Sequence, residues 1–190
     1  MSARIFIDGE VGTTGLQIKA RLESRTDIEL VSLAEEVRKD AGARAEALNS
    51  VDVAILCLPD DAAVEAVSMI SNPDVKVIDA STAFRVADDW AYGFAEYDAD
   101  QRAIIASAKR VSNPGCYAVA SISILHPLVS AGLIPASHGV TINAISGYSG
   151  GGKQLIAGFE TGDDVNTPFF VYGLNLKHRS EEHTSELQSH

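Results

Sequence analysis

The sequence predicts an α/β protein in which a doubly wound parallel sheet is followed by the beginning of an α+β domain. Short apolar, β-branched runs alternate with helix-like stretches from the N-terminus to about residue 110, as they do where helices connect parallel strands. A glycine-rich loop follows the first of these runs. A Ser-Asn-Pro-Gly-Cys-Tyr turn stands where the alternation ends, so we expect a first domain over residues 1–113 and a second from residue 114.

The composition favours a globular protein of the cytoplasm. Of the 190 residues, 46% are hydrophobic, which is enough for a sizeable core, and no apolar run approaches the roughly 20 residues of a membrane span. The net charge of −11 comes without a basic cluster, which disfavours nucleic acids and anionic membranes as partners. Two cysteines provide no disulfide framework, and we expect no metal site.

The first strand, at Arg4–Asp8, leads into a glycine loop and then a helix in which Leu16, Ile18, Ala20 and Leu22 recur at helical spacing. Glycines let the main chain approach a pyrophosphate at a helix N-terminus, where free N–H groups bind anions, as in Rossmann-type domains. The residues expected to bind such a cofactor are Gly9, Gly12, Thr13, Thr14 and Gly15. The spacing is GxxGxxG and not GxGxxG, so an ordinary glycine turn is the alternative.

The end of the second strand, predicted at Ile28–Leu33, favours NADP as the cofactor. Ser32 or Leu33 stands where an Asp or Glu would hold the free ribose 2′-hydroxyl of NAD. Arg38 and Lys39 follow and could pair with a 2′-phosphate, or they could be solvated loop charges.

The next two strands, Val51–Leu58 and Val75–Asp79, each end in polar residues. Cys57 lies in the first of these apolar runs and is expected in the core, and Asp60 is placed as the N-cap of a helix with Ala63, Val67 and Ile70 on one face. After the second strand, Ser81 supplies a hydroxyl and Arg85 a guanidinium at a sheet edge where ligands bind. Arg85 could hold a carboxylate or phosphate there, or form a surface ion pair.

The cysteine turn, Ser112–Tyr117, carries the most chemistry. Cys116 precedes an apolar helix-like run from Tyr117 to about Leu128, and a helix N-terminus favours the nucleophilic thiolate. The alternative is a small buried core residue, but the adjacent proline and glycine favour a fixed, exposed bend.

A second glycine-rich loop follows a predicted strand at Val140–Ile145. Its main-chain N–H groups, hydroxyls and one ammonium suit a phosphoryl oxygen. We assign Ser149, Gly150 and Gly151 to cofactor binding and Lys153 to substrate binding, with a surface turn as the alternative.

Five segments, in this order, resemble the short (type 2) N-acetyl-gamma-glutamyl-phosphate reductases: FIDGEVGTTG, DASTAFR, YGFAE, SNPGCY and SGYSGGGK. The resemblance covers residue 3 to about 178. It implies an NADP-dependent oxidoreductase of arginine biosynthesis, in which the cysteine matching Cys116 forms a thioester from an acyl phosphate and NADPH reduces it to a semialdehyde. Aspartate-semialdehyde dehydrogenases share the glycine loop and are the alternative enzyme class.

The same resemblance implies further site residues. Ser112 and Asn113 would lie near the nicotinamide, and Arg85 near the substrate carboxylate or phosphate. From its place after the strand, we assign Ser81 to substrate binding as well. His178 matches the first histidine of the family's His-x-His-x-Pro-Glu segment and would be the acid–base. The full-length protein is expected to be a homo-oligomer.

Residues 179–190 depart from the family pattern. They read as the translation of a common sequencing-library adapter, so we expect an artefactual tail after an incomplete second domain at 114–178. The chain as written is therefore expected to be an inactive fragment, which could still bind the cofactor without turnover.

Overall fold

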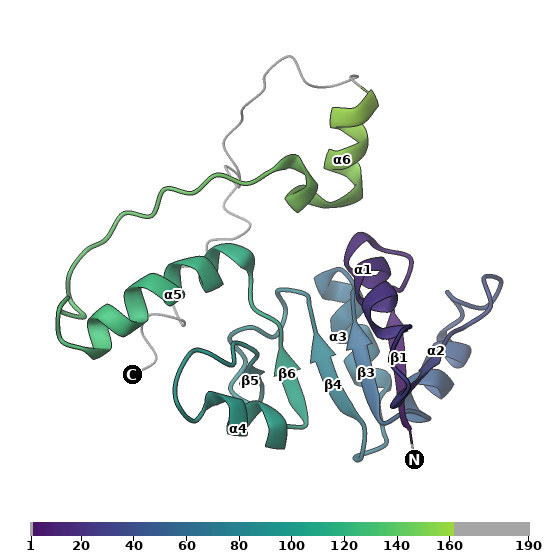
Figure 1. Ribbon diagram of the computed structural model, residues 1–190. Helices are drawn as coiled ribbons and strands as arrows, with labels where there is room; N and C mark the ends of the chain where they lie inside the picture. Colours follow the sequence, from purple (N-terminus) through teal and green to yellow (C-terminus); the bar gives the residue numbers. More distant parts are fainter. Residues whose placement is uncertain (1, 162–190) are drawn as a thin grey trace. The chain divides into compact units, whose positions relative to one another are not determined.

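A computed structural model describes the backbone of residues 2–161 and the side chains of 2–150 and 156–161 (Figure 1). It consists of two units, Met1–Gly115 and Cys116–His190. The division falls two residues after the predicted boundary at 113. Each unit is described by itself below.

Unit 1 is built on a six-stranded sheet with the order β2-β1-β3-β4-β6-β5, and all of its neighbouring strands pair in parallel. The prediction of a parallel α/β sheet is confirmed. The strands are β1 (Ala3–Asp8), β2 (Ile28–Val31), β3 (Val53–Leu56), β4 (Lys76–Asp79), β5 (Ala91–Tyr92) and β6 (Arg110–Ser112).

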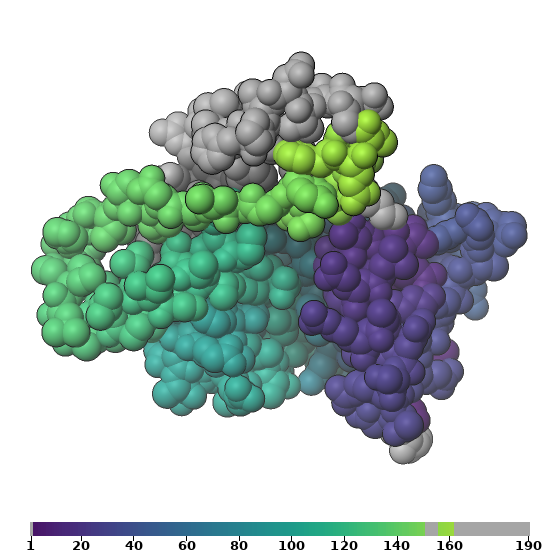
Figure 2. Space-filling view, turned by 45° about the horizontal axis from the view of Figure 1, so that its top comes forward, coloured from purple at the N-terminus to yellow at the C-terminus, as the bar shows by residue number. Residues whose placement is uncertain are grey.

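The sheet is doubly wound, because alternate residues of its strands pack against different helices. Ile5, Ile7 and Ile55 form a cluster with Ile18 and Leu22 of α1 (Thr13–Leu22). The strand residues between them face the opposite side of the sheet, where they form a second cluster with α2 (Ala41–Asn49) and α3 (Asp60–Met69). The buried members of this cluster include Phe6, Ala54, Leu56, Val77, Leu48 and Ala66. Period-two alternation thus gives each face its own helices. Figure 2 shows unit 1, purple to teal, as one continuous body.

Three local predictions in unit 1 need correction. β2 ends at Val31 and not at Leu33, and Leu16 lies on the exposed side of α1. Asp60 is not an N-cap: Pro59 holds that position, and Asp60 is the first helical residue. Its carboxylate instead accepts hydrogen bonds from the Thr82 N–H, at 2.8 Å, and the Thr82 hydroxyl, because the loop after β4 passes close to it.

The short helix α4 (Gln101–Ser107) precedes β6 and packs against β5. Among the residues that the structure describes, no helix is long and apolar enough to cross a membrane.

Unit 2 begins with α5 (Cys116–Ser130), so the predicted helix after the turn is confirmed and starts at the cysteine itself. Further on come a 3-10 turn, η1 (Tyr148–Gly151), and α6 (Gly152–Thr161). The strand predicted at Val140–Ile145 is wrong, since that segment has no regular structure and Ile145 is 90% exposed. A strand needs a neighbour to pair with, and the described part of unit 2 contains none.

Candidate functional site

The polar loops of unit 1 gather at one edge of the sheet. Because all six strands are parallel, the loops after β1, β3, β4 and β6 leave from their shared carboxyl edge, where open α/β sheets bind ligands. These loops contain most of the predicted site residues that the structure describes.

The glycine loop after β1 is folded so tightly that Gly9 and Gly15 leave no room for a side chain. Gly9 has φ +89°, a left-handed conformation that favours glycine. A Cβ on Gly15 would lie only 2.2 Å from the Gly9 carbonyl oxygen. Because glycine has no side chain, α1 can start directly over the loop. The N-cap residue Gly12 gives no side-chain cap, so the first N–H groups of α1 are available to an anion. The loop therefore fits a dinucleotide pyrophosphate.

Glu10 brings a carboxylate from this loop to the end of β2. It accepts hydrogen bonds from Lys19 Nζ at 2.8 Å and from Ser32 Oγ at 3.1 Å. The residue predicted to face the ribose therefore has an acidic neighbour from the loop, which the sequence pattern did not indicate. Arg38 pairs with Glu35 at 3.0 Å, in keeping with the alternative of a loop charge.

A buried ion pair that sequence reasoning missed lies just before the glycine loop. Arg44 of α2 donates to Asp8 Oδ2 through Nη2 at 2.9 Å and through Nε at 3.2 Å, and it reaches Glu65 of α3 at 3.2 Å. Burial by itself would lower the pKa of Arg44, but the hydrogen bonds and charges of Asp8 and Glu65 raise it. No short-range motif links these residues, which lie 36 and 21 positions apart.

The end of β4 holds a second buried carboxyl group, on Asp79. It is fully buried, and its Oδ2 accepts from the Ser81 hydroxyl at 2.6 Å. Among the residues that the structure describes, its Oδ1 has no hydrogen-bond partner. Burial raises its pKa, against the lowering by the Ser81 hydrogen bond and the Arg85 charge. Ser81, predicted to bind substrate, is itself buried and turns its hydroxyl to Asp79.

Arg85 spans two of the loops. Its Nε donates to the main-chain oxygen of Asn113 at 3.1 Å, and its Nη2 donates to that of Ala80 at 3.4 Å. These contacts differ from the surface ion pair considered from the sequence, and they link the β4 loop to the cysteine turn.

The structure brings Ser112 and Asn113 to the same edge. Ser112 is fully buried on β6, opposite Asp79, and the Asn113 N–H donates to the Asp79 main-chain oxygen at 2.7 Å. Pro114 and Gly115 follow, and then α5 begins with Cys116, whose side chain is exposed.

Cys57 differs from Cys116 in its surroundings. It is half-buried, and it packs against the cluster of Ile5, Ile7 and Ile55. Burial raises the pKa of its thiol to about 11, with smaller contributions from the charges of Asp79 and Asp8.

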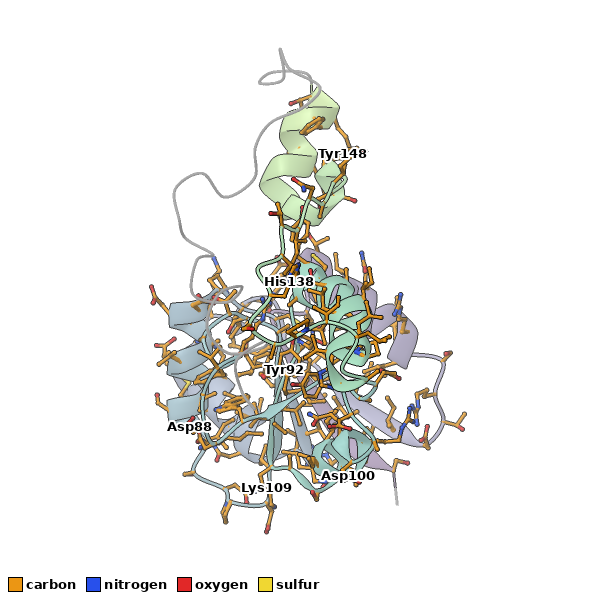
Figure 3. The ribbon with its side chains drawn as sticks, turned by 90° about the vertical axis from the view of Figure 1, so that its left-hand side faces the viewer. Asp88, Tyr92, Asp100, Lys109, His138 and Tyr148 are labelled. Carbon is orange, nitrogen blue, oxygen red and sulfur yellow. The ribbon has the colours of Figure 1, made fainter. Side chains whose placement is uncertain are left out.

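The second glycine loop of unit 2 forms η1 and the start of α6. The Gly150 N–H donates to Gly147 O at 3.0 Å within the turn, and the Tyr148 ring, labelled in Figure 3, stacks on Phe159 with 5.0 Å between ring centroids. Ser149 is exposed. The side chain of Lys153 and the whole of His178 lie outside the described residues, as does Gly151 beyond its backbone.

One cavity belongs to no predicted site. A cavity of about 210 Å³ lies at the opposite edge of the sheet, between the end of α3 and Lys109, away from the glycine loop. No group of three or more His, Cys, Asp or Glu side chains that could hold a metal occurs within the described ranges.

Two family models match the chain. The semialdehyde dehydrogenase NAD binding domain matches residues 30–105, and the semialdehyde dehydrogenase dimerisation domain matches residues 116–190. The second match begins at Cys116, where unit 2 begins. It also includes residues 179–190, so the predicted artefactual tail, which lies outside the described residues, stays a prediction.

Curated relatives match over the whole chain. The N-acetyl-gamma-glutamyl-phosphate reductase of Chelativorans sp. (strain BNC1) is 58% identical over 190 residues, and that of Rhizobium rhizogenes is 54% identical over 194. The matches cover 100% of this chain but only 60% and 62% of those proteins. The chain thus spans about three fifths of the length of these relatives.

Solved structures with the same fold are more distant in sequence. Aspartate semialdehyde dehydrogenase II from Vibrio cholerae has a TM-score of 0.61 at 18% identity, over 90% of this chain and 56% of that one. The Francisella tularensis enzyme has a TM-score of 0.60 at 14% identity, over 97% and 58%. At this identity the likeness shows the fold alone. Together the two family models match more than half of the sequence, and the chain is similar to semialdehyde dehydrogenases in both of its units.

Proposed function

We propose that this chain is part of an NADP-dependent N-acetyl-gamma-glutamyl-phosphate reductase. The observation that carries the proposal is the exposed Cys116 at the first position of α5, after a turn attached to the dinucleotide-type sheet. Support comes from the 58% identity to a protein of that name across the whole chain. The product would be a semialdehyde of arginine biosynthesis.

Cys116 would act as the nucleophile. Its sulfur forms a bond to the acyl carbon of N-acetylglutamyl phosphate, the C–O bond to phosphate breaks, and inorganic phosphate leaves with the bonding electrons. The resulting thioester is reduced by two electrons and one proton, and the thiolate then leaves to give the aldehyde. A thiolate suits both steps, because it is a good nucleophile and a good leaving group.

The glycine loop would hold the cofactor pyrophosphate at the start of α1, and bound NADPH would supply the hydride. Ser112 and Asn113 would lie beside the nicotinamide, since Ser112 ends β6 and Asn113 follows it at the same edge. Ser81 and Lys153 would contact the substrate, and His178 keeps the acid–base role that the family resemblance implies. The cytoplasmic location stays a prediction.

We also propose that the full-length protein is a homo-oligomer. The match of residues 116–190 to a dimerisation-domain model supports this. The chain as written, at about three fifths of the length of its relatives, is proposed to lack turnover.

An aspartate-semialdehyde dehydrogenase activity is the second candidate. The fold supports it equally, but the similar solved structures are only 14–19% identical to this chain. Assaying the full-length protein with both acyl phosphates decides between them. Reduction of aspartyl phosphate as fast as N-acetylglutamyl phosphate would contradict the proposal.

Replacing the nucleophile tests the mechanism. We expect Cys116→Ser in the full-length protein to abolish reduction, because a serine alkoxide is far costlier to form, while NADP binding is retained. Rates by cofactor absorbance and binding by calorimetry measure the two effects. Turnover within about tenfold of the parent would remove Cys116 as the nucleophile.

Cofactor choice is tested by titrating the same protein with NADP and NAD. We expect NADP to bind more tightly, because β2 ends without its own carboxylate. Equal or tighter binding of NAD would mean that Glu10, and not Ser32, faces the ribose.

A further inference from the structure

Asn113 holds the main chain of the cysteine turn just after β6. Its N–H donates to Asp79 O at 2.7 Å, and its carbonyl oxygen accepts from Arg85 Nε at 3.1 Å. Pro114 then restricts its own φ angle and the conformation of Asn113. Only Gly115 separates this fixed segment from Cys116.

Arg85 is itself held at the β4 loop. Its Nη2 donates to Ala80 O at 3.4 Å, and its charge acts on the buried Asp79 carboxyl group. Asp79 is bonded to Ser81, whose hydroxyl also accepts from the Ala83 N–H at 3.2 Å. The guanidinium thus joins an internally bonded loop after β4 to the turn after β6.

We propose that Arg85 is a positioning residue, whose guanidinium fixes the Asn113 carbonyl and so sets the entry to the turn that carries Cys116. This inference rests on the proposed function only for its kinetic consequence. It differs from the substrate-anchoring role that the family resemblance implies, because these two contacts go to the protein's own main chain.

The two roles predict different kinetics in the full-length protein. If Arg85 is a positioning residue, Arg85→Lys should lower kcat by about tenfold to a hundredfold and leave the KM for the acyl phosphate little changed. The reason is that lysine offers one point charge in place of the planar guanidinium fork. A substrate anchor means a higher KM at similar kcat. The second result would overturn the proposal.

Alkylation of Cys116 tests the same point without any substrate. We expect Arg85→Ala to slow iodoacetamide labelling of Cys116 at pH 8 by about tenfold or more, and free guanidinium ion to restore part of the rate. Restoration would show that the variant is folded. Labelling at the parental rate would overturn the proposal, whether or not the protein reduces N-acetylglutamyl phosphate.

Arg110→Gln is the matched control. Arg110 lies on β6, the strand that leads into the turn, but it pairs with the exposed Asp89 at 2.7 Å and lies over the Trp90 ring. We expect its labelling rate and kcat to match the parent. Hydrogen exchange of the Asn113 N–H provides a further readout, and faster exchange in Arg85→Ala but not in Arg110→Gln is expected.

Discussion

The two cysteines lie in different surroundings. Cys116 starts a helix with an exposed side chain, whereas Cys57 is half-buried against isoleucines near two carboxylates. A thiol reacts through its thiolate, so surroundings that oppose a negative charge make it inert.

This difference predicts selective alkylation. With the Cys57 pKa raised to about 11, about one thiol in a thousand is ionised at pH 8. Iodoacetamide at pH 8, followed by peptide mass spectrometry, should label Cys116 at least about tenfold faster than Cys57. Cys116→Ser is the control and should leave only slow labelling. Comparable rates at the two positions would refute the assignment.

Asp79 predicts a pH-dependent stability. Because its folded-state pKa is raised by burial, the native protein binds this proton more tightly than the unfolded chain, and stability falls as pH rises from the unfolded pKa through the folded one. Asp79→Asn removes the ionised form and keeps an acceptor for Ser81. We expect urea unfolding to show a more stable variant at pH 7.5.

The advantage of Asp79→Asn should shrink as the pH falls, because protonation of the parent carboxyl group, which its raised pKa favours, removes the buried charge. Nearby charges on Arg85 and Asp60 shift the window in opposite directions but do not change its sign. If the variant were less stable than the parent at pH 7.5, the buried Asp79 charge would not be destabilising.

At the scale of elements, β1, α2 and α3 are joined through Arg44. The Arg44 and Asp8 side chains are 12% and 7% exposed, so removing one would leave the other charge buried and unpaired. Arg44→Met should therefore lower the free energy of unfolding by about 3–5 kcal/mol. Chemical denaturation measures this.

Arg102→Met is the matched control for Arg44. Its pair with Glu96, at 3.5 Å, is exposed on both sides, and such pairs contribute about 0–1 kcal/mol. Equal effects of the two substitutions would mean that water reaches the Asp8–Arg44 pair.

The elements that the sequence predicts are those set by local pattern. The glycine loop follows β1 and precedes α1, and α5 starts at the predicted turn, because periodicity and turn residues act over a few positions. Val140–Ile145 carries a strand-like composition, yet strand formation depends on a distant partner. Composition alone could not decide it.

The contacts of the candidate site could be predicted only in part. That Asp79, Ser81, Arg85 and Asn113 share an edge follows from the parallel sheet. Two contacts depend on loop geometry that no motif encodes. Arg85 donates a hydrogen bond to Asn113, 28 residues away, and Asp60 accepts one from Thr82, 22 residues away.

For the whole molecule, the two units predict a limited-proteolysis pattern. Unit 1 has its own sheet and two apolar clusters, whereas the described part of unit 2 exposes Ile124, Leu133 and Ile145 at 65%, 72% and 90%. We expect the expressed 190-residue chain to leave a resistant fragment ending near residues 113–115, and to self-associate through unit 2.

Adding NADP supplies the control for this experiment, since a bound ligand should slow cleavage of unit 1 alone. A monodisperse chain that resists protease through residue 178 and reduces N-acetylglutamyl phosphate would contradict both the pattern and the proposed lack of turnover.

The order of the strands along the chain also bears on biosynthesis. Each strand that the structure describes lies before Asn113, and the carboxyl edge of the sheet is made by loops that precede Cys116. Translation proceeds from the N-terminus, and domains fold as units while the ribosome is still working. Unit 1 can therefore fold on the ribosome, with its glycine loop formed, before Cys116 has left the exit tunnel.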